Sequence, residues 1–111
     1  MDEIIAEGKT AKQLRKERED RIHKTIALEV PDRVPIICGM GYFPGKYCKV
    51  PSSAAYYDHE AWLNAYRKTM LDYQSDLIFP QAPQPGKAME LLGLKTTKWP
   101  GYGVDEWKGH Q

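Results

Sequence analysis

Two loops of the sequence carry residue types that could contact a small molecule. Gly41 and Tyr42 follow one short apolar run, and Gln81 follows another. Glycine lets a ligand approach the backbone closely, and a phenol or an amide can hydrogen-bond to it. We therefore predict a substrate-binding site at Gly41, Tyr42 and Gln81, because α/β enzymes often bind substrates in loops that follow strands. The alternative is that Tyr42 and its aromatic neighbours only pack the loop.

Three other residues could suggest metal chemistry. Cys38, Cys48 and His59 are ten and eleven residues apart, and these spacings match no close pair of ligands of the kind that zinc sites use. We predict no metal ligand and no disulfide. The sequence singles out no catalytic residue.

The two apolar runs are expected to be strands that position the loops. Val34–Cys38 and Asp76–Phe79 are short, and each ends in a stretch rich in Gly or Pro. Asp58 can cap an amphipathic helix between them, and a helical crossover of this length would make the strands parallel. We expect the first strand to be buried on both faces and both strands to bring their loops to one rim.

Other segments are predicted from their caps and breakers. Thr10 can cap a long charged helix that begins at Ala11 and is ended by Pro31. Residues 39–53 are expected to form a long loop. Lys87–Leu92 should form a short helix, and residues 94–99 should form either a third strand or an excursion of the loop.

The totals limit the classes of protein. With 111 residues and 41% hydrophobic content, the chain fits one domain. Sixteen basic residues against 15 acidic ones give no global attraction to nucleic acid or to an anionic membrane, so we expect neither partner. No apolar run approaches the roughly 18 residues of a membrane span, and we expect a cytoplasmic protein.

Several short motifs occur in a familiar order between about residues 15 and 104. They are Arg21-Ile22, Pro31-Asp32-Arg33-Val34-Pro35, Asp76 and Leu91-Leu92-Gly93. This order resembles the N-terminal part of the uroporphyrinogen decarboxylase superfamily. The resemblance implies an α/β fold, a partial (β/α)8 TIM-type barrel in which residues 1–111 form a single incomplete domain. Residues 1–30 would be a leading helical segment, followed by the first two or three βα units.

The resemblance implies one of two reactions for the parent enzyme. The family includes porphyrinogen decarboxylases that use no cofactor and methyltransferases that depend on a corrinoid. The decarboxylases supply arginines from the first loop and an aspartate after the second strand. Here no arginine lies between Cys38 and Tyr47, Lys46 is the only cation there, and Pro80 and Gln81 stand where the aspartate would fall. These departures favour the methyltransferase-like or uncharacterised branches, and the sequence leaves the choice open.

The resemblance also sets expectations about partners. A tetrapyrrole or corrinoid-type small molecule would bind the parent enzyme, and any zinc or corrinoid would be held beyond this chain, so we expect no cofactor within it. The 111-residue chain alone is expected to be inactive, and either to be unstable or to self-associate through open sheet edges. The alternative function is a small, non-enzymatic interaction module that uses the charged N-terminal helix.

Overall fold

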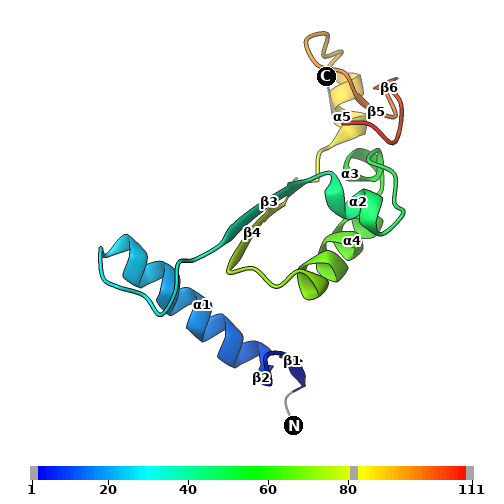
Figure 1. The fold of residues 1–111 in the computed structure, drawn as a ribbon. Helices are drawn as coiled ribbons and strands as arrows, with labels where there is room; N and C mark the ends of the chain where they lie inside the picture. The colour runs from blue at the N-terminus through cyan, green and yellow to red at the C-terminus, as the bar shows by residue number, and fades with distance from the viewer. Residues whose placement is uncertain (1–2, 81–82, 110–111) are drawn as a thin grey trace.

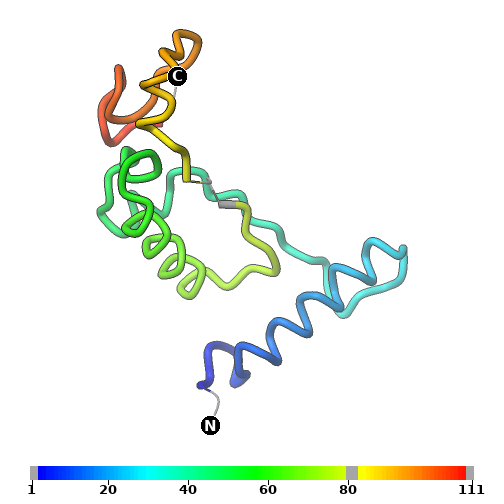
Figure 2. Tube along the Cα trace, turned by 180° about the vertical axis from the view of Figure 1, so that it is seen from behind, coloured from blue at the N-terminus to red at the C-terminus, as the bar shows by residue number. Residues whose placement is uncertain are grey.

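The chain is mixed α/β, as the sequence predicts. The computed structural model describes residues 3–80 and 83–109. Figure 1 shows an N-terminal arm, a central pair of strands with helices beside it, and a C-terminal segment at the far end. The radius of gyration is 17.3 Å, whereas a compact domain of this length would have about 13 Å. The molecule is therefore extended, and its arm stands away from the helices (Figure 2).

The arm begins with a hairpin that the sequence analysis did not predict. Strands β1 (Ile4–Ala6) and β2 (Lys9–Thr10) pair antiparallel. Glu7 and Gly8 connect them with φ angles of +55° and +68°. Positive φ at both residues is typical of the tight type I′ turn, whose twist matches that of the strands. A single Glu-Gly pair between such short runs is a weak sequence signal.

Helix α1 (Ala11–Ile26) completes the arm. Its predicted cap is confirmed, because the Thr10 side chain accepts from the Gln13 N–H and the Gln13 side chain accepts from the Thr10 N–H. The predicted end near Pro31 is wrong. Leu28 has φ +60°, and the Glu29 N–H returns to the Lys24 carbonyl at 2.8 Å, which closes the helix in a Schellman motif.

The central pair is parallel, which confirms the main structural prediction. Strand β3 (Ile37–Gly41) pairs with β4 (Leu77–Pro80), with Ile37 beside Leu77 and Gly39 beside Phe79. The predicted start of the first strand at Val34 is wrong by three residues. Pro35 has no N–H, and the Ile36 N–H donates to the Asp76 carboxylate at 2.7 Å instead of to a strand.

Three helices connect the two strands: α2 (Phe43–Tyr47), α3 (Ala54–Tyr57) and α4 (His59–Asp72). The predicted Asp58 cap of α4 is confirmed, since its side chain accepts from the Ala61 N–H. Residues 39–53 are not a continuous loop, because β3 runs to Gly41 and α2 follows. Pro44 in the first turn of α2 supplies the φ angle that a helix start needs.

The core lies between α3, α4 and the C-terminal segment. Its fully or nearly buried members include Trp62 and Tyr66 of α4, Tyr56 of α3, and Trp99. Gly45 lies so close to this core that an added Cβ would be 2.7 Å from the Trp62 ring. The backbone of α2 is thus pressed onto the indole of α4.

The C-terminal segment contains α5 (Gly86–Leu91), β5 (Trp99–Pro100) and β6 (Gly103–Val104). The predicted short helix is confirmed. A third strand over residues 94–99 is wrong, because only Trp99 of that stretch belongs to a strand, and the loop alternative describes residues 94–98. Trp99 is fully buried, and its indole N–H donates to the Tyr57 hydroxyl at 2.9 Å, so core packing decides the path of this segment.

The prediction that the first strand is buried on both faces is wrong for the described residues. Met40 and Ile78 pack against the core on one face of the sheet. Ile37 and Phe79 are 53% and 59% exposed. Successive side chains of a strand point to opposite faces, so one face of the sheet is covered by helices and the other is bare.

Candidate functional site

The candidate site is the end of the sheet where both strands stop. Because β3 and β4 are parallel, Gly41 and Pro80 end them on the same side. A Cβ added at Gly39 or Gly41 would meet nothing within 4 Å, so the backbone here borders open space. Gly41 has φ +53°, a conformation that favours glycine. A ligand could therefore approach the backbone of this rim closely.

The bare face of the sheet leads to this rim. Phe79 lies beside Gly39 in the register, and Ile37 is two residues before Gly39 on the same face. The exposed phenyl ring and the open glycine together form an apolar floor without charge. Neither Gly39 nor Phe79 was among the site residues predicted from the sequence. Side chains alternate between the two faces of each strand. This alternation, combined with the register of β3 against β4, could have identified both residues as neighbours on the bare face.

The predicted site residues have different environments. Gly41 lies on the rim, and its carbonyl accepts a hydrogen bond from the Tyr66 hydroxyl at 2.6 Å. The Tyr42 ring lies 5.9 Å from that of Trp62, and its hydroxyl is 2.9 Å from the Tyr56 hydroxyl. Burial and this hydroxyl contact raise the pKa of Tyr56. These contacts are the ones expected if Tyr42 packs the loop against the core. Contact between Tyr42 and a substrate stays a prediction.

Gln81, the third predicted residue, lies outside the described residues. Its neighbour Pro80 ends β4 at the rim. The rim therefore brings together the backbone positions of Gly41 and the end of β4, as expected from parallel strands.

A cavity of about 400 Å³ lies beside β3. Phe43 and Tyr73 contribute aromatic walls, and their ring centroids are 5.7 Å apart. Cys38, Gly39 and Met40 supply the strand side, and Gln74 and Ser75 supply a polar border. The cavity is mainly apolar and has room for a small uncharged group.

The opposite end of the sheet is held by an ionic cluster, Arg21–Asp32–Arg33–Asp76. The Asp76 side chain is fully buried and contacts the Arg21 guanidinium. Arg33 donates to both Asp76 carboxylate oxygens at 3.0 Å. Arg21 also donates to both oxygens of Asp32 at 2.7 and 2.8 Å. Asp32 and Arg33 are neighbours in the sequence but pair with different side chains, Asp32 with Arg21 of α1 and Arg33 with Asp76, which directly precedes β4.

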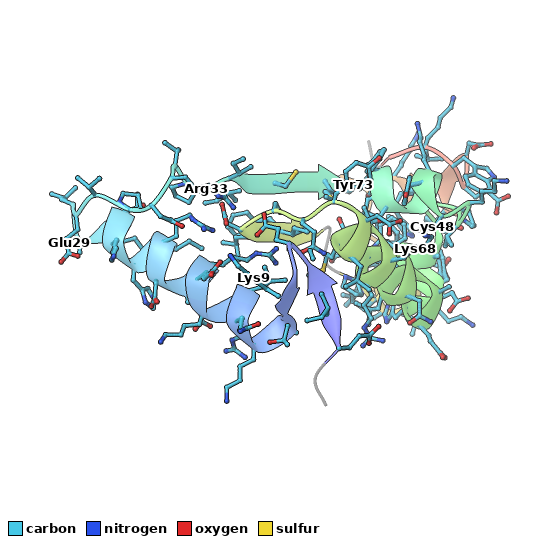
Figure 3. All side chains as sticks on the ribbon, turned by 60° about the horizontal axis from the view of Figure 1, so that its bottom comes forward. Lys9, Glu29, Arg33, Cys48, Lys68 and Tyr73 are labelled. Carbon is cyan, nitrogen blue, oxygen red and sulfur yellow. The ribbon has the colours of Figure 1, made fainter. Side chains whose placement is uncertain are left out.

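This cluster connects the arm to the sheet. Arg33 lies where the link from α1 reaches the strands (Figure 3). Arg18 of α1 adds one hydrogen bond to Gln74 at 2.6 Å. Polar contacts thus carry much of the attachment of α1, and they lie at the start of the strands, away from the rim. Residues at this end of a parallel α/β sheet normally serve stability.

Stability should fall in acid as the cluster titrates. The hydrogen bond from Arg21 lowers the pKa of Asp32 to about 2. Burial alone would raise the pKa of Asp76, but the Ile36 N–H and Arg21 hold it below its ordinary value. Since both pKa values are lower in the folded chain, the stabilisation from both carboxylates is present above about pH 3.9 and is lost in acid, and for Asp32 the loss occurs as the pH falls towards 2. Thermal unfolding followed by circular dichroism should show this loss.

The matched control is Asp32→Asn, which removes the exposed titrating group and keeps its shape. Its unfolding midpoint should change less between pH 4 and pH 2 than that of the unaltered chain. An identical acid response in the two proteins would contradict the assignment to this carboxylate.

Two further properties limit the chemistry. Within residues 3–80 and 83–109, no group of three His, Cys, Asp or Glu side chains could hold a metal ion. Over the same residues, no helix is both long and apolar enough to cross a bilayer.

Comparisons with family models, with curated proteins and with solved structures found no match to this chain.

Proposed function

We propose that this chain supplies the first two βα units of a barrel enzyme similar to the uroporphyrinogen decarboxylase superfamily, with its rim forming part of a tetrapyrrole or corrinoid site. One observation carries the proposal: a parallel pair of strands has one bare apolar face that ends in an open glycine rim. Parallel strands are normally buried on both faces. A bare face on this pair is therefore expected if the two strands belong to a larger sheet. A complete barrel of this type needs roughly 250 residues.

The shape of the molecule supports the same proposal. The extended arm and the exposed Ile37 and Phe79 leave apolar surface that further strands of a barrel would cover. Loops at the carboxyl ends of barrel strands form the active site, and Gly41 is in that position.

The floor of the rim suits the ring face of a macrocycle. Phe79 offers a ring surface, and Gly39 allows close approach without a side chain in the way. Between Cys38 and Tyr47 no guanidinium is present to hold carboxylates, and the only cation there is Lys46. Corrinoid-linked methyl transfer and tetrapyrrole decarboxylation are the two reactions proposed for the parent enzyme, and no residue of this chain is assigned a catalytic role.

Zinc does not fit the described part of the chain, because no suitable group of ligands occurs there. A zinc ion used by the parent enzyme would depend on ligands other than the described residues. The proposed contribution of the chain is to bind and orient the macrocycle.

Titrations with uroporphyrin and with hydroxocobalamin, followed by their absorbance, test the proposal. One of the two should bind to the 111-residue protein in a saturable way. Gly39→Leu should weaken that binding by about tenfold or more, equivalent to about 1.4 kcal/mol, because the new side chain fills the floor. Leu63→Ala on the exposed side of α4 is the control and should leave the binding unchanged.

Two results would contradict the proposal. One is the absence of saturable binding to either macrocycle, and the other is equal binding by Gly39→Leu. Salt-dependent binding to nucleic acid without macrocycle binding would instead support the module that uses the charged helix.

A further inference from the structure

The outer edge of β3 has backbone groups without a partner strand. The Ile36 carbonyl accepts from the Leu77 N–H, so it points towards β4. The N–H and C=O groups of successive residues point to opposite sides of a strand. The backbone groups of Cys38 therefore point towards β4, and those of Ile37 and Gly39 point away from it. Figure 3 shows β3 at the border of the molecule, with no described strand beyond it.

This edge also lacks the residues that normally block edge pairing. The sequence of β3 is Ile-Cys-Gly-Met-Gly, which has no charge and no proline. Edges are commonly protected by lysine, proline or a covering element. A bare edge of this kind fits another strand, and an identical strand is present on every copy of the chain.

We propose that the 111-residue chain forms a two-fold symmetric dimer in which β3 of one copy pairs antiparallel with β3 of the other. The result is a four-stranded sheet with the order β4–β3–β3–β4. In a longer protein that closes a barrel, another strand of the same chain would occupy this edge. The inference therefore concerns the 111-residue chain itself. It uses the hydrogen-bonding edge of β3, whereas the proposed macrocycle site uses the bare face of the sheet, and Gly39 belongs to both.

The backbone selects one register. Ile37 and Gly39 of one copy face Gly39 and Ile37 of the other, and each such pair exchanges two hydrogen bonds. A shift in one direction would place Pro35, which has no N–H, against Gly39. A shift in the other direction would need Gly41, whose carbonyl already accepts from Tyr66 at a point where the register of the sheet is irregular. In the proposed register, the large side chain of Ile37 also lies opposite Gly39 of the other copy.

This register places Cys38 on the two-fold axis. The two Cys38 residues form a pair without hydrogen bonds, in which the Cα atoms lie about 4.5 Å apart. That distance is within the range of a disulfide. Cys38 is partly exposed, and the cavity beside it leaves room for the second side chain. Cys48 lies away from this strand and contacts the Ala65 carbonyl at 3.5 Å.

The test combines mass measurement with oxidation of the purified chain. Sedimentation should give a species of twice the 12.7 kDa chain mass under reducing conditions. Diamide should then link the copies, because two Cys38 thiols lose two electrons and two protons to form one S–S bond, and diamide is reduced to its hydrazine. Cys38→Ser should abolish the linked band on a non-reducing gel, and Cys48→Ser should not.

A second variant tests the pairing without relying on sulfur. Gly39→Pro removes an outward N–H and leaves the bonds to β4 in place, so it should weaken the dimer by about tenfold or more through two lost hydrogen bonds. Gly39→Ala is the matched control and should remain dimeric, with unchanged circular dichroism. A monomer under reducing conditions, crosslinking through Cys48, or an unaffected Gly39→Pro dimer would each overturn the inference. None of these results bears on macrocycle binding.

Discussion

Replacement of Asp76 by alanine should destabilise the chain by about 3–5 kcal/mol, the range for removing one partner of a buried ion pair. The carboxylate is fully buried and accepts hydrogen bonds from Arg21, Arg33 and the Ile36 N–H. Alanine would leave the guanidinium of Arg21, a residue that is only 5% exposed, without its Asp76 partner. It would also remove the acceptor of the Ile36 N–H, just before β3. Urea unfolding followed by circular dichroism measures the change.

Asp72→Ala is the control for this substitution. Asp72 pairs with Lys68 and accepts from the Tyr47 hydroxyl on the surface. Solvent screens such a pair, so its loss should change the unfolding midpoint far less. Equal effects of the two substitutions would show that Asp76 does not hold the arm and the sheet together.

Replacement of Trp62 by alanine should cost a similar amount, about 3–5 kcal/mol, because it empties the centre of the core. Trp62 is fully buried, and its ring lies 5.8 Å from the ring of Tyr66 and 5.9 Å from that of Tyr42. It also supports the α2 backbone at Gly45. Since whole domains are stable by only about 5–15 kcal/mol, this substitution should leave the chain close to unfolding at room temperature.

Trp107→Ala is a matched control, because Trp107 is 42% exposed and lies outside this core. Its unfolding free energy should change by well under half as much. A stable Trp62→Ala chain with native circular dichroism would mean that the core is centred elsewhere.

Local chemistry made several elements predictable. Thr10 and Asp58 both cap helices, since their side chains can satisfy N–H groups of the first turn. The parallel arrangement of β3 and β4 followed from two apolar runs separated by a long helical connection. These signals act over short distances along the chain or follow from its connectivity.

Other features depended on contacts between distant residues. The start of β3 is set by the Asp76 carboxylate, which accepts a hydrogen bond from the Ile36 N–H, 40 residues earlier in the sequence. The path of residues 94–98 depends on burial of Trp99. Neither contact is visible in local patterns, so strand limits in these places could not be predicted.

The candidate site was predictable in position more than in residue identity. Gly41 was expected in the loop after the first strand, whereas it is the last residue of that strand, on the open rim. Tyr42 was expected beside it, but its ring turns towards Trp62, since an aromatic core was available within reach. Phe79 was missed because only the loops that follow the strands were considered for the site.

The parallel arrangement of β3 and β4 supports both the rim and the proposed function, and nuclear Overhauser effects between backbone protons test it most directly. The account predicts contacts between Ile37 and Leu77 and between Gly39 and Phe79 within one chain. Mixing isotopically labelled and unlabelled chains separates these from contacts between copies. Contacts of Ile37 with Phe79 in place of Leu77 would indicate antiparallel strands and would contradict the account.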